Sequence, residues 1–120
     1  MIAANIDSAE PFVTKDGSSI REAAGPVSLP ARNQSLAEAT VAPGAETEEH
    51  YHRLTEELYW FTSGTGLMSV DGEERPVRPG DCVVIPPGAR HKVRNTGERP
   101  LVLLCCCAPP YSHEDTVIVG

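Results

Sequence analysis

The sequence predicts a small all-β domain. Its 120 residues include 11 prolines and 10 glycines, which interrupt short runs of β-branched and aromatic residues. Turn signals recur about every eight to twelve residues, and no segment has the periodicity of an amphipathic helix. A chain of this length forms one domain and buries roughly two-thirds of its unfolded surface. The pattern therefore favours a closed or sandwiched arrangement of strands.

The first segment, residues 1–30, is expected to be an arm with short strands. Asp16-Gly17 predicts a hairpin turn, and prolines break the segment at Pro11, Pro26 and Pro30. The apolar residues of this segment are too few, among so many prolines and polar residues, to build a core of their own. We therefore expect the arm to pack on a second copy of the chain, which gives a homodimer.

The remaining strands are expected between residues 31 and 108. Short apolar runs, each bounded by turn residues, predict strands at 34–42, 46–53, 57–63, 66–70, 73–77, 81–85, 90–95 and 100–107. Asp71-Gly72 indicates a two-residue hairpin, because both positions of such a turn favour positive φ. Pro79-Gly80 and Pro86-Pro87-Gly88 predict further corners.

The last of these strands leads into three adjacent cysteines, at 105–107. Neighbouring strand residues point to opposite faces, so these cysteines cannot readily pair with one another. We expect reduced, buried thiols, with either Cys105 and Cys107 or Cys106 alone facing the interior.

Residues 109–120 are expected to form an exposed C-terminal extension. The segment begins with two prolines, which donate no ladder hydrogen bond, and its polar residues do not suit a core. The alternative is a lid that folds Tyr111 and His113 over an opening in the barrel.

Two spaced groups of residues place three of the 4 histidines and one carboxylate in a metal-ligand arrangement. The groups are Gly44-x5-His50-x-His52-x4-Glu57-x6-Gly64 and Gly80-x5-Pro86-x-Gly88-x2-His91-x3-Asn95. Alternate residues of a strand share a face, so His50 and His52 can present two imidazoles to one ion. Glu57 can reach the same ion across a short turn. His91 must come from a distant strand, so the site requires the folded sheet.

These two groups resemble the paired motifs of the cupin superfamily at every glycine, histidine, proline, glutamate and asparagine position. The 15 residues between Gly64 and Gly80 are similar to the spacing in small single-domain bacterial cupins of the conserved-barrel cupin 2 type. The resemblance implies a double-stranded β-helix, or jelly-roll barrel, over residues 31–108. It also implies one divalent transition metal per chain, Mn, Fe, Ni, Cu or Zn, with the ligands His50, His52, Glu57 and His91. Glu56 is the competing carboxylate, but the six-residue gap to Gly64 fits Glu57.

Strand alternation also predicts the surroundings of this centre. Tyr59 and Phe61 share the inward face with Glu57, whereas Leu58 and Trp60 face outward. An exposed Leu-Trp pair is typical of an association surface, so we place Trp60 at or near the dimer interface. The candidate pocket residues are Tyr59, Phe61, Gln34, Met68 and His113.

The superfamily supports many reactions on one barrel, so the resemblance leaves the reaction open. Four protein ligands leave a position for water or dioxygen, and we expect a small-molecule metalloenzyme, a dioxygenase-like oxidoreductase. The alternatives are a non-catalytic module that binds or senses a small ligand, and a zinc-dependent isomerase or rearrangement enzyme, including one that forms nitrogen–nitrogen bonds. The sequence assigns no catalytic residue.

Charge and hydropathy limit the partners of the chain. A net charge of −7 and a pI near 5.0 argue against nucleic acid as a partner. No apolar run is long enough to span a bilayer, and the N-terminus lacks the pattern of a secretory signal. We therefore expect a cytoplasmic protein whose partner is a small-molecule substrate or ligand, with no membrane contact.

Overall fold

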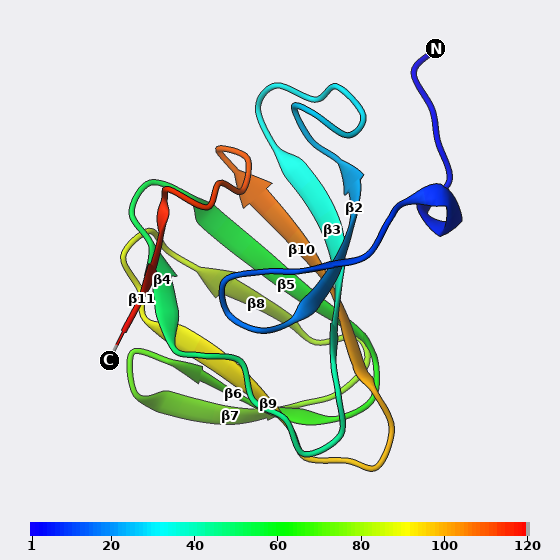
Figure 1. Ribbon diagram of the computed structural model, residues 1–120. Helices are drawn as coiled ribbons and strands as arrows, with labels where there is room; N and C mark the ends of the chain where they lie inside the picture. The colour runs from blue at the N-terminus through cyan, green and yellow to red at the C-terminus, as the bar shows by residue number, and fades with distance from the viewer. Residues whose placement is uncertain (120) are drawn as a thin grey trace.

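Two antiparallel sheets face each other and enclose one core (Figure 1). The computed structural model describes residues 1–119. Its elements are the 3₁₀ helix η1 (Ile6–Ser8) and the strands β1 (Phe12–Val13), β2 (Ser19–Ala24), β3 (Ser35–Val41), β4 (His50–His52), β5 (Glu56–Ser63), β6 (Gly66–Val70), β7 (Glu73–Val77), β8 (Cys82–Ile85), β9 (His91–Asn95), β10 (Leu101–Ala108) and β11 (Thr116–Ile118).

The strand order is that of a jelly-roll barrel of the double-stranded β-helix type, as the sequence predicted. One sheet has the order β1-β2-β3-β10-β5-β8, and the other has the order β11-β4-β9-β6-β7. Both sheets contribute to the core, where the most deeply buried large apolar side chains are those of Phe61, Ile85, Val93, Leu101 and Leu103. Among residues 1–119, no helix has the length and the hydrophobicity needed to cross a membrane.

Turn residues set the corners of the barrel. Asp71 and Gly72 have φ values of 49° and 84° and join β6 to β7, as the sequence predicted for this hairpin. Gly64 has φ of 81°, and a Cβ at this position would lie 2.6 Å from the carbonyl oxygen of Pro100. Both the conformation and the close approach require glycine there.

The strand predicted at 46–53 is much shorter in the structure, because only His50–His52 form β4. The backbone before it bonds elsewhere: the amide of Glu48 donates to the carbonyl of Asp16 at 2.9 Å, and the amide of Thr47 donates to Val93 at 3.0 Å. The segment before β4 is therefore held partly by the N-terminal turn rather than by a regular ladder.

The N-terminal segment joins the sheet of its own chain. β2 pairs with β3 over most of its length, and Ile20 is part of the core. The predicted hairpin at Asp16-Gly17 connects β1 to β2, with φ of 92° at Gly17. The six-stranded sheet therefore contains residues that we had expected to pack on a second copy.

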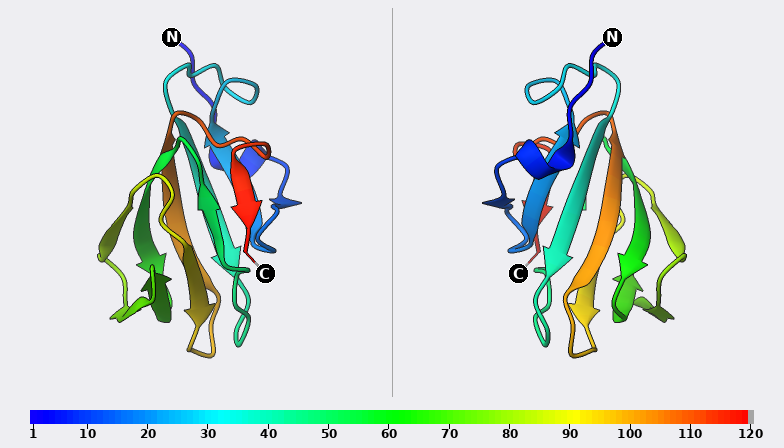
Figure 2. Two further views of the ribbon diagram at one scale, coloured as in Figure 1. Left: turned by 90° about the vertical axis from the view of Figure 1, so that its left-hand side faces the viewer. Right: turned by 90° about the vertical axis from the view of Figure 1, so that its right-hand side faces the viewer.

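The C-terminal segment differs from the exposed extension that we expected. Residues 116–118 form β11, which pairs with β4 so that Thr116 lies opposite His52. The side views show that β11 and the N-terminal segment lie on the same side of the barrel (Figure 2). The prolines at 109 and 110 prevent a strand only at the start of the segment, and the chain resumes pairing after it.

Candidate metal centre

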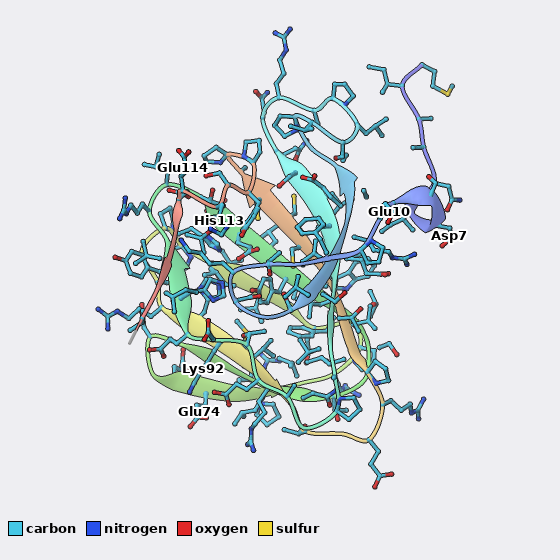
Figure 3. The ribbon with its side chains drawn as sticks, viewed as in Figure 1. Asp7, Glu10, Glu74, Lys92, His113 and Glu114 are labelled. Carbon is cyan, nitrogen blue, oxygen red and sulfur yellow. The ribbon has the colours of Figure 1, made fainter. Side chains whose placement is uncertain are left out.

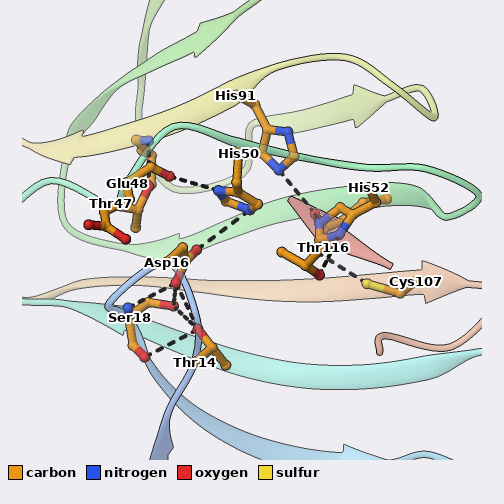
Figure 4. A network of polar contacts seen from close by, with 12 residues as sticks. Thr14, Asp16, Ser18, Thr47, Glu48, His50, His52, His91, Cys107 and Thr116 are labelled. Atoms are coloured by element: carbon orange, nitrogen blue, oxygen red, sulfur yellow. Dashed lines mark hydrogen bonds and ion pairs between the residues drawn. The ribbon is translucent and has the colours of Figure 1, made fainter. Parts of the chain in front are cut away.

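Three buried imidazoles meet between the sheets (Figure 4). His50 and His52 come from β4, and His91 of β9 lies opposite His50 in the ladder. Their ring centroids are 4.2 to 5.4 Å apart. One nitrogen of each ring lies within 4.8 Å of the others, so the three residues form a group that could hold a metal ion.

The other nitrogen of each ring is fixed by a hydrogen bond. Nδ1 of His50 lies 2.8 Å from the carbonyl oxygen of Glu48, and Nδ1 of His91 lies 2.9 Å from that of Ala89. A carbonyl oxygen only accepts, so each Nδ1 carries the proton and leaves a lone pair on Nε2.

The same tautomer follows for His52. Its Nδ1 lies 3.0 Å from Oγ1 of Thr116, whose hydroxyl donates to the carbonyl of Ser112 at 2.9 Å. Because the hydroxyl proton of Thr116 is already in that hydrogen bond, its Oγ1 accepts a hydrogen bond from the N–H of Nδ1. Nε2 of His52 therefore keeps its lone pair in the neutral ring. In this tautomer each neutral imidazole turns the lone pair of its Nε2 toward the centre.

The carboxylate of Glu57 on β5 lies beside two of these imidazoles. Its Oε1 lies 3.1 Å from Nε2 of His52 and 3.4 Å from Nε2 of His91. Its Oε2 accepts a hydrogen bond from the thiol of Cys107 at 3.2 Å. Burial disfavours the charged carboxylate, but hydrogen bonds from the imidazoles of His52 and His91, in the state in which their Nε2 atoms carry protons, outweigh burial and lower the pKa of Glu57 to about 2. In the tautomers described above, a metal ion would supply the positive charge in place of those protons. Glu56, the competing carboxylate, is exposed.

These donors fit a metal ion. Nε2 of His91 is a buried polar atom with no hydrogen-bond partner within residues 1–119. Burial, together with the neighbouring His91, lowers the pKa of His50, so its imidazole stays neutral. Lone pairs that face a carboxylate oxygen repel it unless a positive charge lies between them. Three imidazole nitrogens and one carboxylate are a donor set that divalent transition metals accept.

A cavity opens beside this centre. Besides the imidazoles of His50 and His52, it is lined by apolar side chains of β2, β3 and β10 and by hydroxyl-bearing side chains, including those of Thr14, Ser35 and Thr116. Tyr59 also lines it, and its ring lies 5.8 Å from that of His91. Burial raises the pKa of the Tyr59 phenol, so the group stays protonated.

Four of the five predicted pocket residues lie elsewhere. Phe61 and Met68 do not line the cavity, because they pack within the hydrophobic core. Gln34 is exposed just before β3, with its Oε1 4.0 Å from the outward thiol of Cys106. His113 is exposed near β11 (Figure 3). Both residues lie outside the strands, where strand alternation does not fix the direction of a side chain.

The alternation of the three cysteines is now settled. Cys105 and Cys107 face inward and line the cavity, whereas Cys106 faces outward. Burial raises the pKa of both inward thiols, so they stay protonated. The described structure leaves all four cysteines, including exposed Cys82, without a disulfide.

Three further residues surround the imidazoles, and sequence reasoning missed two of them, Thr116 and Asp16. Thr116 fixes His52, the ring of Tyr111 lies 6.1 Å from that of His52, and Asp16 of the N-terminal turn lies 3.7 Å from His50. Tyr111 fits the alternative in which the tail covers an opening. Asp16 preceded a glycine, a pattern that indicated a turn and gave no signal of a site.

Comparison with known proteins agrees with the fold. Residues 37–107 match the family model of the cupin domain. An uncharacterized protein of Methanocaldococcus jannaschii is 47% identical over 119 residues, which cover 99% of this chain and 95% of that protein.

Two solved structures show the same architecture. A nucleoside dehydratase from Streptomyces, Pac13, superposes with a TM-score of 0.82 at 17% identity, over 99% of this chain and 91% of that one. Oxalate decarboxylase from Bacillus subtilis gives a TM-score of 0.79 at 29% identity, over 95% of this chain and 30% of that one. These two enzymes thus carry different activities on one barrel fold.

Proposed function

The chain belongs to the cupin family, and we propose that it is a metal-dependent enzyme that acts on a small organic molecule at the centre formed by His50, His52, Glu57 and His91. The observation that carries this proposal is the group of three buried imidazoles within reach of one ion, with Oε1 of Glu57 beside those of His52 and His91 and a cavity next to them. The ion is one of Mn, Fe, Ni, Cu or Zn, with one per chain.

In this proposal the residues have three roles: they hold the ion, orient the imidazoles and line the cavity. The imidazoles and Glu57 hold the ion, and Thr116 and the carbonyls of Glu48 and Ala89 hold the imidazoles in position. Ile20, Ala37 and Leu103 give the cavity apolar walls, which bind a small organic molecule and exclude water. A bound divalent ion supplies a Lewis acid and, if it is redox-active, a site for electron exchange with dioxygen.

We favour dioxygenase-like oxidation as the reaction. The support is the combination of imidazole and carboxylate donors, which suits redox-active ions, with an apolar cavity next to them. The four free cysteines support a reducing, cytoplasmic location.

The first experiment identifies the ion. Protein purified without added metal is analysed by plasma emission, and oxygen consumption is then screened over a panel of small organic substrates. We expect about one transition-metal ion per chain, and a His52→Ala variant should lose roughly 100-fold or more in metal affinity because a ligand is removed.

The matched control is Glu56→Ala, which removes an exposed neighbouring carboxylate and should retain the ion. Full occupancy in His52→Ala would show that the ion binds elsewhere. A redox-inert ion such as zinc, together with no oxygen uptake, would exclude the oxygenase and favour rearrangement or ligand binding.

A further inference from the structure

The N-terminal turn places a carboxylate in the cavity beside the candidate metal centre. Asp16 lies between β1 and β2, and only 9% of the residue is exposed. Its Oδ1 accepts three hydrogen bonds, from Oγ1 of Thr14 at 2.7 Å and from the amide and hydroxyl of Ser18 at 2.9 and 2.7 Å. Its Oδ2 lies 3.7 Å from Nε2 of His50 and accepts no hydrogen bond from residues 1–119 (Figure 4). One oxygen is thus held in place, and the other faces the centre.

Hydrogen bonds join the turn that contains Asp16 to the segments that orient the imidazoles of His50 and His52. The carbonyl of Asp16 accepts from the amide of Glu48, the residue whose own carbonyl fixes His50. The ammonium of Lys15 donates to the carbonyl of Thr116 at 2.8 Å. The position of Asp16 relative to the centre is therefore set by direct bonds, and it does not depend on a free loop.

The charged side chains that line the cavity all have the same sign, because the ammonium of Lys15 bonds to the backbone of Thr116 and is not part of the lining. Within residues 1–119, the charged side chains that line it are those of Asp16, Glu22 and Glu57, and neither lysine nor arginine is among the lining residues. An anionic ligand would therefore meet uncompensated negative charge at short range, apart from the charge of a bound ion. A ligand with a hydroxyl or an amine would instead find a free acceptor in Oδ2 of Asp16.

We propose that Asp16 selects the ligand of this centre: Oδ2 accepts a hydrogen bond from a hydroxyl or amine of a neutral or cationic small molecule, and its charge disfavours carboxylates and phosphate esters. This inference rests on the proposed metal centre. It concerns a residue outside the segment that matches the family model, residues 37–107.

The test measures which small ligands bind to the metal-loaded centre, and it requires no catalytic activity. The protein is loaded with Co²⁺, and the visible spectrum of the ion is titrated with azide, an anion, and with imidazole, a neutral ligand that carries an N–H donor. In Asp16→Asn the side chain keeps its size and loses its charge. The ratio of azide affinity to imidazole affinity should rise by about tenfold or more, because a full charge is removed within a few ångströms of the ligand.

Glu56→Gln is the control, because it removes one exposed carboxylate close to the centre in sequence. Its affinity ratio should stay within twofold of wild type. If Asp16→Asn does not fold, as judged by circular dichroism, Asp16→Ala must change the ratio in the same direction.

The outcomes separate this inference from the proposed function. A wild-type protein that gives no Co²⁺ spectrum overturns both. A normal spectrum with a ratio that rises less than threefold in Asp16→Asn overturns the role of Asp16 alone. Loss of Co²⁺ from Asp16→Asn would make Asp16 a metal ligand and also contradict the inference, as would a loaded wild-type protein that binds neither probe.

Discussion

The thiol of Cys107 determines which oxygen of Glu57 is free. Because the protonated thiol donates to Oε2, only Oε1 faces the imidazoles. A carboxylate held in this way is oriented before an ion arrives, which reduces the entropy lost on binding. The raised pKa of Cys107 keeps the donor proton in place, so this cysteine orients Glu57 and is not a reactive thiolate.

Substitution of Cys107 tests this role. Cys107→Ala should weaken metal binding by about tenfold, since Glu57 loses its orienting donor. Cys107→Ser keeps a donor of similar size and should remain within about threefold of wild type. Dissociation constants from competition with a chelating dye measure both effects. Equal affinities in the two variants would mean that Cys107 only fills space.

At the scale of elements, β11 links the C-terminal segment to the centre. It pairs with β4, and Oγ1 of its Thr116 accepts a hydrogen bond from Nδ1 of His52. The same residue donates to the carbonyl of Ser112, which holds the chain before β11. β11, which is far from the two motifs in sequence, therefore sets the tautomer of His52, a candidate metal ligand.

A valine at position 116 tests this link, because it preserves the shape of the side chain and removes the hydroxyl. Thr116→Val should lower metal affinity by about tenfold and broaden the electron paramagnetic resonance signal of bound Cu²⁺, since His52 loses its orienting partner. The control is Thr62→Val, which removes an exposed hydroxyl bonded to Val102 far from the centre. Unchanged affinity in Thr116→Val would assign β11 a purely structural role.

At the scale of the whole molecule, the outer face of the six-stranded sheet carries a group of exposed apolar side chains. Trp60 is 51% exposed and Val84 is 57% exposed. Leu58 lies opposite Val84 across β5 and β8, and Leu36 is exposed on β3 of the same sheet. Contiguous apolar surface of this kind is typical of an interface between protein chains.

We therefore predict a homodimer in solution at micromolar concentration, with Trp60 at its interface. Light scattering should report about twice the chain mass of 12.9 kDa. Trp60→Glu should give the monomer, because it buries a charge against apolar surface. Val27→Glu, at an equally apolar but separate exposed position after β2, should remain dimeric. A Trp60→Glu variant that stays dimeric would place the contact on another face.

The local sequence pattern determined which strand residues share a face and where one hairpin forms. The alternation of strand residues predicted that His50 and His52 share a face, that Trp60 points outward and that Asp71-Gly72 forms a hairpin, and the structure confirms each of these features. These properties depend on residues within a few positions of one another, so a sequence records them directly.

Only the tertiary structure decided which groups surround the imidazoles. Asp16, Cys107 and Thr116 reach the centre from segments that are far away in sequence, and no local period encodes such a distance. Long-range strand pairing brings them together, and burial makes each contact strong because water no longer competes for it. Gln34 and His113 lie outside the strands and do not line the cavity. The sequence by itself thus determined the barrel and the faces of its strands, whereas packing of the two sheets determined the chemistry of the wall opposite the imidazoles.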